Sequence, residues 1–348
     1  MAKWMSKAKK TKSRGSGYPA YWARTTWVSR LLTPLSWLYR AWVTVRLSWY
    51  HRGWLKSVRL PLPVIVVGNI SVGGTGKTPL VLWLAARLRE AGYRPGIVSR
   101  GYKGKAKKPM VVRADSDAAV CGDEPVMLAR DSGCPVWIGK DRAKAAQALI
   151  EANPVCNVII SDDGLQHYRL ARDVEIAVVD GARGNGNGKL LPAGPLREPV
   201  VRLQTVDAIV VRGSLSESLM STLRNAFTMT LEPVKLRNLH EVNRTLAFKS
   251  LKDKRVHAVA GIGNPQQFFD SLTRLGITHV PHAFPDHHAF KAADITFDDG
   301  DTVVMTEKDA VKCERFATND HWALQTEARI HKSLLQRVVE RMKAVAPR

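Results

Sequence analysis

Acidic residues are absent from the first 89 positions of this 348-residue chain, and sixteen Lys and Arg residues precede the first carboxylate, Glu90. Most of the net charge of +22 therefore belongs to the N-terminal quarter of the chain. A basic segment without counter-charges is typical of proteins that bind anionic lipid headgroups or the phosphates of nucleic acid.

Long apolar runs and paired cysteines are also missing. No stretch of about 18 uncharged apolar residues occurs, which argues against a membrane-spanning helix. No small-residue cleavage site follows an uninterrupted apolar region, which argues against a removable signal peptide. The four cysteines have neither metal-ligand nor redox spacing, so we expect buried thiols in a reducing cytoplasm. They are Cys121, Cys134, Cys156 and Cys313.

Tryptophan and other apolar residues are plentiful in the same basic segment, where seven of the ten tryptophans lie within residues 1–54. A helical 4-3-4-3-4 spacing joins Leu31, Leu35, Leu38, Trp42, Val45 and Trp49. An amphipathic helix of this kind suits a membrane interface, where indoles and basic side chains meet the headgroups. Nucleic-acid binding would explain the charge but not the apolar stripe, and packing on the protein's own core is the remaining alternative.

These patterns divide the chain into four parts. Residues 1–25, rich in Lys, Ser and Gly, are predicted to be a disordered extension, and residues 26–60 an amphipathic membrane-associated helix. Short apolar runs then alternate with helical patterns, which predicts an α/β fold with a mostly parallel sheet over residues 61–250. A smaller C-terminal α/β domain with a final helix is predicted over residues 251–348. The strand-like runs are Val64–Val67, Gly96–Ser99, Val158–Ser161, Ile176–Val179, Ala208–Val211, Val256–Ala260 and Val303–Met305.

A glycine-rich segment, GNISVGGTGKTP at residues 68–79, directly follows the first strand-like run and opens a helical pattern. This is the setting of a P-loop, in which backbone N–H groups and a helix N-terminus hold phosphates. It predicts a core of the P-loop NTPase type that binds ATP, with Lys77 at the β and γ phosphates and the Thr78 hydroxyl on Mg²⁺. The strict pattern has Gly where this chain has Ser71. The predicted nucleotide-binding residues are Ser71, Val72, Gly73, Gly74, Thr75, Gly76, Lys77 and Thr78.

Two adjacent carboxylates, Asp162 and Asp163, follow the strand-like run that ends at Ser161. A P-loop needs a carboxylate for its metal at the end of a neighbouring strand. Adjacent carboxylates also repel each other unless a cation offsets their charge. We therefore expect this pair to bind Mg²⁺, with Glu124 as a further candidate, and we leave open which of the two contacts the metal.

Phosphoryl transfer to a hydroxyl group also needs a proton acceptor and a phosphate clamp. Asp123 lies at the start of a helical pattern and suits the base, or else it caps that helix. Arg197 lies in a proline-stiffened loop and can hold a phosphate through two N–H groups, or else it is simply exposed. Arg100 and Tyr102 follow the second strand-like run, at the sheet edge where the P-loop lies, and suit the substrate.

Seven motifs in succession resemble those of the tetraacyldisaccharide 4'-kinase family. They are GNISVGGTGKTP (68–79), SRGY (99–102), GDEP (122–125), DDGLQH (162–167), PAGPLREP (192–199), FPDHH (284–288) and TEKDAVK (306–312). The resemblance implies transfer of the ATP γ-phosphate to the 4'-hydroxyl of a tetraacylated glucosamine disaccharide 1-phosphate, a late step of lipid A biosynthesis. It leaves the extension over residues 1–25 unexplained.

The resemblance also implies roles for residues and a location. Asp123 would act as the base together with His287, in a pair that forms when the two domains close. The predicted catalytic residues are Asp123, His287, Lys77 and Arg197. The predicted substrate-binding residues are Arg100, Tyr102, His167 and Glu198. The enzyme would lie peripherally on the cytoplasmic face of the inner membrane.

Two other classes of protein share parts of this pattern. A membrane-recruited P-loop NTPase switch would need no pairing of Asp123 with His287 and would form no phosphorylated product. A nucleic-acid-dependent ATPase would not need the apolar stripe. The lipid-sugar kinase hypothesis accounts for all of these features, so we expect ATP and Mg²⁺ as cofactors, a lipid acceptor and no nucleic-acid partner.

Overall fold

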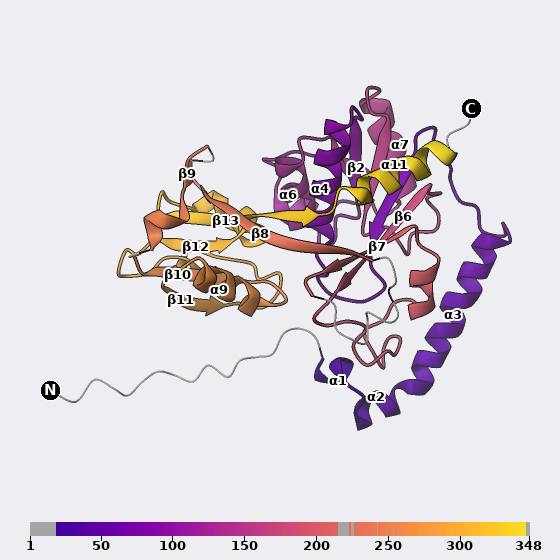
Figure 1. Cartoon of the computed structure of the whole chain (residues 1–348), viewed down its shortest axis with the longest axis horizontal. Coiled ribbons are helices and arrows are strands. Elements are labelled where there is room, and N and C mark those ends of the chain that lie inside the picture. The colour runs from indigo at the N-terminus through magenta and orange to yellow at the C-terminus, as the bar shows by residue number, and fades with distance from the viewer. Residues whose placement is uncertain (1–18, 215–222, 224–225, 242, 253, 346–348) are drawn as a thin grey trace.

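The structure, a computed structural model, describes residues 19–345 apart from positions 215–222, 224–225, 242 and 253. Two α/β units lie side by side and share one continuous sheet, with the larger core unit on the right of Figure 1 and the smaller second unit on the left. The predicted α/β class with a mostly parallel sheet is confirmed.

The core unit is built on parallel strands whose side chains alternate between two apolar layers. These strands are β1 (Val64–Gly68), β2 (Pro95–Ser99), β4 (Val136–Ile138), β5 (Val158–Asp162), β6 (Val174–Asp180) and β7 (Ala208–Arg212), with β3 (Met110–Val112) antiparallel at the edge. In β1, Ile65 and Val67 join one hydrophobic cluster, and Val64 and Val66 join the other. A strand covered on both faces needs mostly apolar residues, which is why β1 is an unbroken apolar run. Strands β2 and β5 carry polar side chains only where they end, at Ser99 and at Ser161 and Asp162.

Helices cover both faces of these strands. The core-unit helices are α4 (Lys77–Glu90), α5 (Ala118–Cys121), α6 (Asp123–Asp131), α7 (Arg142–Ala152) and the 3-10 helix η1 (Val200–Gln204). Leu84 of α4 and Leu128 of α6 belong to the cluster of Ile65, whereas Leu149 of α7 belongs to the cluster of Val64. All four cysteines are free and buried, as expected.

The second unit repeats the α/β plan on a smaller scale. Its parallel strands are β10 (Val256–Ala260), β11 (His279–Ala283) and β12 (Val303–Thr306). Its helices are α9 (Pro265–Arg274), α10 (Glu307–Cys313), η2 (Phe248–Leu251), η3 (Ala292–Asp294) and η4 (Glu314–Phe316). Phe268 and Leu272 of α9 pack on β10 in a hydrophobic cluster that is separate from those of the core unit.

A long two-stranded ribbon joins the units: β8 (Phe227–Asn238) runs antiparallel to β13 (His321–Ile330), and the short β9 (Thr245–Leu246) pairs with β8. The sheet order is β11-β10-β12-β13-β8-β7-β6-β1-β5-β2-β4-β3. Met229 of β8 lies in a core-unit cluster and Leu236 in the second unit's cluster. The domain boundary predicted at residues 250 and 251 therefore falls beyond a strand that already belongs to both units.

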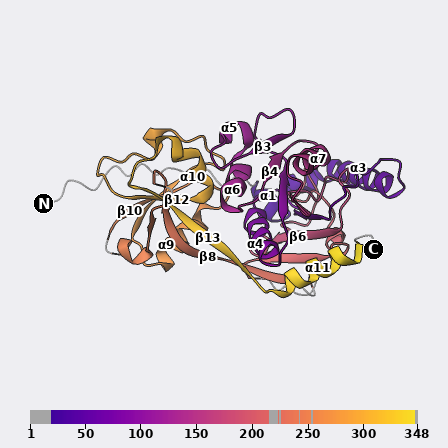
Figure 2. The same cartoon turned by 90° about the horizontal axis from the view of Figure 1, so that it is seen from above.

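The final helix, α11 (Ser333–Val345), packs on the core unit and not on the second unit where it was predicted. Leu334, Val338 and Met342 join the cluster that contains Ile65. Figure 2 shows α11 lying across the core unit, beside β6. The ribbon explains this correction, because β13 carries the chain back to the core unit before α11 begins.

The N-terminal segment forms three helices, α1 (Ala20–Ala23), α2 (Trp27–Leu31) and α3 (Thr33–His51). Residues 1–18 of the predicted disordered extension lie outside the described residues. The prediction of disorder does not fit residues 20–23, because α1 is helical and the Trp22 indole N–H donates to the Pro192 carbonyl at 3.0 Å. Figure 1 shows α3 along the outer side of the core unit.

Helix α3 packs on the core unit through Ser36, Tyr39 and the buried Val43, and it presents its apolar stripe outward. The Ser36 hydroxyl donates to the Leu190 carbonyl at 2.7 Å, and the Tyr39 hydroxyl donates to the Arg197 carbonyl at 3.1 Å. By contrast, Leu38 is 69% exposed. The rest of the predicted stripe is also exposed: Leu31, Leu35, Trp42, Val45 and Trp49. The alternative of an apolar face packed on the protein's own core is therefore wrong. Within the described residues, every helix is too short or too polar to cross a membrane.

Candidate functional site

The glycine-rich segment forms a loop between β1 and α4. Gly73 and Gly76 have φ values of 101° and 91°, in the left-handed region that favours glycine. A Cβ atom on Gly76 would lie 2.8 Å from Cδ of Arg212, so this position also needs a residue without a side chain. The loop leads directly into the N-terminus of α4, where unpaired backbone N–H groups and the helix dipole favour an anion.

Lys77 is the first residue of α4, and its ammonium group lies inside the loop. Its Nζ is 3.2 Å from Asn69 Oδ1 and 3.3 Å from Asp163 Oδ1. Only 11% of this side chain is exposed. The structure thus places Lys77 between the loop and the carboxylates at the end of β5, where it can meet the phosphates of a nucleotide.

The two carboxyl groups at the end of β5 have opposite electrostatic environments. Complete burial, with the charges of Glu124 and Asp163 beside it, raises the pKa of Asp162 to about 7. Burial also acts to raise the pKa of Asp163, but the nearby charges of Lys77, Arg197 and Arg142 outweigh it and lower that pKa to about 2. Asp163 is therefore deprotonated at neutral pH. Asp162 loses its proton readily only when a cation lies beside it.

These carboxyl groups fit a divalent cation. Asp162 Oδ2 accepts a hydrogen bond from the Ser99 hydroxyl at 3.0 Å, whereas its Oδ1 is buried without a hydrogen-bond partner among the described residues. A buried carboxylate oxygen that lacks a donor is costly unless a ligand or ion meets it. Oxygen atoms are also the ligands that Mg²⁺ prefers. Thr78, the second residue of α4, is half-buried beside Lys77 and remains a candidate ligand.

Two arginines converge on Asp163, of which sequence analysis identified one. Arg197, the one that was predicted, has its Nη1 3.4 Å from Asp163 Oδ1. Its loop runs beside the phosphate loop, because Val72 N–H donates to the Pro195 carbonyl at 2.8 Å. Arg142, which the sequence did not single out, is buried and donates to the Asp163 carbonyl at 2.6 Å. Its position at the start of α7, far from any motif, offered no signal.

A third group of charges borders the phosphate loop. The buried Asp180, at the end of β6, caps the following turn by accepting from the N–H groups of Ala182 and Arg183 at 3.1 Å each. Its other oxygen binds the guanidinium groups of Arg183 and Arg212. Arg183 in turn donates to the Gly74 carbonyl of the loop.

Asp123 and His287 are in contact across the two units. Asp123 is the first residue of α6, and its Oδ2 lies 3.1 Å from His287 Nδ1. The N-cap of α6 is Gly122, and Asp123 makes no capping hydrogen bond, so the capping alternative is wrong. Burial acts to raise the pKa of Asp123, but the hydrogen bond from His287 and the charges of Lys312 and Lys308 outweigh it and lower that pKa. The Asp123 carboxylate is thus available to accept a hydrogen bond or a proton.

A small cleft joins this pair to the carboxylates at the end of β5. It has a volume of about 20 Å³ and is lined by Ser99, Arg100, Tyr102, Asp123, Glu124, Pro125, Asp162, Asp163 and His287. The Tyr102 ring meets the His287 ring edge to face at 5.9 Å between centroids, and 59% of Tyr102 is exposed. A cleft of this size holds little more than one water, so a hydroxyl group can reach its floor but a whole sugar cannot.

Two predicted substrate-binding residues lie outside this cleft. The His167 ring accepts from the Arg142 backbone N–H at 3.3 Å, and burial beside Arg142 lowers its pKa to about 4. Glu198 is only 2% exposed and pairs with Arg202 at 3.2 Å. Both side chains contact other residues of the core unit, and the structure does not bring them to Asp123.

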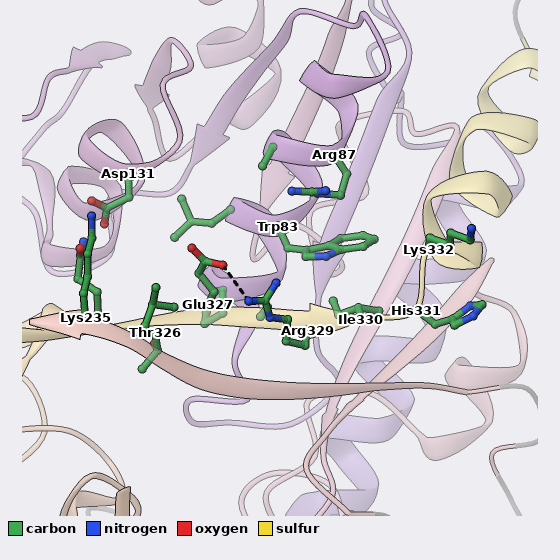
Figure 3. A pocket seen from close by; sticks show the side chains of 16 residues that line it. Trp83, Arg87, Asp131, Lys235, Thr326, Glu327, Arg329, Ile330, His331 and Lys332 are labelled. Carbon is green, nitrogen blue, oxygen red and sulfur yellow. Dashed lines mark ion pairs between the residues drawn. The ribbon is translucent and has the colours of Figure 1, made fainter. Parts of the chain in front are cut away.

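A larger cavity is remote from these groups. It has a volume of about 720 Å³ and lies between the outer face of α4 and the β8–β13 ribbon. Figure 3 shows Trp83 and Arg87 of α4 above Arg329 and Ile330 of β13. None of the predicted site residues lines this cavity. Size alone would therefore misplace the functional site, whose small cleft is where the charged groups meet.

Comparison with known proteins gives consistent matches over nearly the whole chain. The model of a family described as Tetraacyldisaccharide-1-P 4'-kinase matches residues 28–343. Proteins named tetraacyldisaccharide 4'-kinase from Aromatoleum aromaticum and Azoarcus sp. are 52% and 50% identical, over 93% and 94% of this chain and 96% of each relative. A crystal structure titled as the "apo" form of LpxK from Aquifex aeolicus in complex with ATP has a TM-score of 0.77 and 32% identity, over 90% of this chain and 99% of that one.

Proposed function

The chain belongs to the tetraacyldisaccharide-1-phosphate 4'-kinase family, and from that premise we propose that it transfers the γ-phosphate of ATP to the 4'-hydroxyl of a tetraacylated glucosamine disaccharide 1-phosphate. One observation supports specific roles for residues of this chain. Asp163, which contacts Lys77 of the phosphate loop, lines the same cleft as Asp123 and His287. A phosphate-binding group therefore lies beside a proton acceptor, which is what transfer to an alcohol needs.

The core unit holds the nucleotide in this proposal. The N–H groups of the loop over residues 73–78 and the N-terminus of α4 face the phosphates, and Lys77 meets the β and γ phosphates. Arg197 approaches from the neighbouring loop and binds a phosphate oxygen. Asp162 and Asp163 would hold Mg²⁺, with Thr78 and Glu124 as further ligands. A bound Mg²⁺ offsets the negative charge of the phosphate oxygens.

Asp123 receives the proton of the sugar hydroxyl. A hydroxyl group is a weak nucleophile unless its proton can leave as the new bond forms. His287 donates its Nδ1–H to Asp123, which fixes the direction of the carboxylate and leaves its other oxygen for the substrate. Tyr102 and Arg100 border the cleft and would orient the disaccharide.

The test of this function is a product analysis. The full chain, incubated with ATP, Mg²⁺ and detergent-dispersed tetraacyldisaccharide 1-phosphate, should form a bisphosphorylated lipid that mass spectrometry detects, and Lys77→Ala should form none. ATP hydrolysis without a phosphorylated lipid would instead identify the NTPase switch. Hydrolysis stimulated by DNA or RNA would identify the nucleic-acid-dependent ATPase.

We propose a peripheral location on the cytoplasmic face of the inner membrane; the exposed apolar stripe supports the membrane association. In this stripe, Leu38 is 69% exposed and Trp42 is 57% exposed, and the basic residues Arg30 and Arg40 of the same N-terminal segment are exposed too. Indoles and arginines in this arrangement insert at the level of lipid headgroups. The hydrogen bond from Tyr39 to the Arg197 backbone ties this helix to the loop at the phosphate site, so the acceptor can be reached while its acyl chains stay in the membrane.

Vesicle binding tests this location. Replacing Leu38 and Trp42 together with Ser should reduce binding to vesicles that contain anionic lipid by about tenfold or more, because two large apolar side chains leave the interface. A matched control replaces Val155 and Val201, which are 61% and 59% exposed elsewhere on the core unit. Equal binding by both double variants would mean that the stripe does not contact the membrane.

A further inference from the structure

One lysine of the second unit, Lys308, contacts His287 of the catalytic pair and a carboxylate on each of the two units. Lys308 is the second residue of α10, and 20% of its side chain is exposed. Its Nζ lies 3.3 Å from His287 Nε2 and 3.3 Å from Asp286 Oδ1. The same atom is 3.5 Å from Glu124 Oε1 on α6 of the core unit. One ammonium group thus contacts the far side of the His287 ring and a carboxylate on each side of the junction.

These contacts assign the protons of the His287 ring. An ammonium group has three donors and no acceptor, so Nε2 accepts the hydrogen bond from Lys308. A neutral imidazole carries one proton, which must then be on Nδ1, and Nδ1 faces Asp123 Oδ2 at 3.1 Å. The opposite tautomer would direct the lone pair of Nδ1 at the carboxylate and leave the ammonium of Lys308 facing an N–H group.

We propose that Lys308 is a positioning residue for phosphoryl transfer: it holds His287 in the Nδ1–H tautomer and thereby directs the Asp123 carboxylate at the substrate hydroxyl. The inference rests on the proposed function, in which Asp123 receives the proton. The proposal also gives His287 and Asp123 different roles. Nε2 of His287 is occupied by Lys308, so the imidazole orients Asp123 and does not itself take the proton of the sugar.

The backbone at His287 supports a fixed ring. His287 has a φ of 61°, in the left-handed region that a residue with a side chain rarely adopts. Its N–H donates to the Gly261 carbonyl at 3.2 Å, and its ring meets Tyr102 of the core unit. Residues held in such a conformation need several contacts to keep them there, and Lys308 supplies one at the ring itself.

Lys312 provides a matched control on the next turn of α10. Its Nζ lies 2.7 Å from Asp309 Oδ1, and Asp309 is completely buried and accepts from the Gly261 N–H at 2.7 Å. Lys312 therefore makes a similar ion pair within the second unit, without a contact to the His287 ring. The charges of both lysines lower the pKa of Asp123, so loss of Lys312 reports that charge effect and any loosening of α10. Loss of Lys308 also removes the contact to the His287 ring, and the difference between the two variants reports that contact.

The first measurement is the ring nitrogen spectrum of the full-length wild-type protein labelled with ¹⁵N-histidine, with His287 assigned by its absence from His287→Gln. The proposal requires a protonated Nδ1 and an unprotonated Nε2, and an Nε2–H signal would overturn it without any lysine variant. In Lys308→Met the Nδ1–H form should give way to a mixture, whereas Lys312→Met should keep the wild-type pattern. An equal change in both variants would overturn the proposal as a general loosening.

The second measurement is steady-state kinetics. Lys308→Met should lower kcat roughly 10- to 100-fold, the range seen when an outer partner of a functional histidine is removed. KM for ATP should stay within about twofold, because the phosphate loop is intact, and Lys308→Arg should restore part of the lost kcat. An unchanged kcat, or a loss confined to KM, would overturn the proposal. A wild type that forms no bisphosphorylated lipid would instead defeat the proposed function, and the tautomer in the ring spectrum would still decide whether Lys308 holds His287.

Discussion

The two units place different chemistry at the same position of a similar fold. In the core unit, β1 leads into the phosphate loop and β5 into Asp162 and Asp163. In the second unit, the segment after β11 contains His287 and the helix after β12 contains Lys308. Ligands of open α/β sheets bind at the carboxyl ends of strands. Both units follow this rule: the core unit carries the groups proposed for phosphate and metal and the proposed base Asp123, and the second unit carries His287 and Lys308, which are proposed to orient that base.

This comparison shows that the site belongs to neither unit alone. Asp123 is on α6 of the core unit, and its partner His287 is on the second unit. The continuous sheet through β8 and β13 fixes how the two sheet edges face each other. A substitution in the phosphate loop should therefore affect nucleotide binding and phosphoryl transfer without disturbing the junction. A substitution of Asp123 or of His287 should have the same effect as the loss of both.

The largest effect is expected at the phosphate loop. Lys77→Ala removes the cation that is proposed to meet the β and γ phosphates, which should cost several kcal/mol of transition-state stabilisation and abolish measurable lipid phosphorylation. The comparison variant is Lys144→Ala, at an exposed lysine of α7. Near-normal kcat in a folded Lys77→Ala protein would show that the loop of the core unit does not bind the phosphates as proposed.

The junction should give the next largest effect. Asp123→Ala and His287→Ala should each lower kcat by roughly 10²–10⁴, the usual contribution of general base catalysis. The double variant should cost little more than the worse single one, because the two residues act as a unit. KM for ATP should change little. Losses in kcat that multiply in the double variant would show that Asp123 and His287 act separately. The two units would then not share one catalytic pair.

A buried carboxyl group of the second unit should affect stability with pH. Burial, with the charge of Asp131 beside it, raises the pKa of Glu307 from 4.5 to about 7. The folded state then holds a proton that the unfolded state releases, so stability is lost as the pH rises from about 4.5 through 7. The loss is at most about 3 kcal/mol.

Glu307→Gln should remove this part of the pH dependence. Unfolding free energies measured at pH 5 and pH 8 should differ less for Glu307→Gln than for the wild type. Glu151→Gln, at an exposed carboxylate of α7, should follow the wild type. Parallel pH profiles for Glu307→Gln and the wild type would show that Glu307 keeps its ordinary pKa in the folded protein.

The smallest effect is expected from the charges that border the phosphate loop. Asp180→Asn keeps an oxygen for the backbone cap but loses the charge that holds Arg183 and Arg212. We expect a loss of about 2 kcal/mol in unfolding free energy and a higher KM for ATP with kcat nearly unchanged. An unaltered KM would mean that these arginines support the fold and not the loop.

Local chemistry along the chain made much of the core unit predictable. Strands such as Val64–Gly68 are covered on both faces, and only unbroken apolar runs satisfy that setting. The phosphate loop depends on glycines and a lysine at fixed spacing, which the sequence displays directly. The ribbon had no such signal. Pro233 lies in β8 next to a shift in register, where Val234 has no partner opposite Gln325 and Thr326. The two strands also pair across about ninety residues of chain.

The sequence alone determined the α/β class, the phosphate loop, the paired carboxylates and the amphipathic helix, because each depends on neighbours within a few turns of the chain. Only the tertiary structure decided that α11 returns to the core unit, that Lys308 reaches His287, and that Glu198 is turned into the interior. It also decided which face of α3 is exposed, since Ser36 found a buried carbonyl partner that no local pattern reveals. Contacts between distant segments depend on how the two units face each other, and that arrangement is set by the packing of the whole sheet.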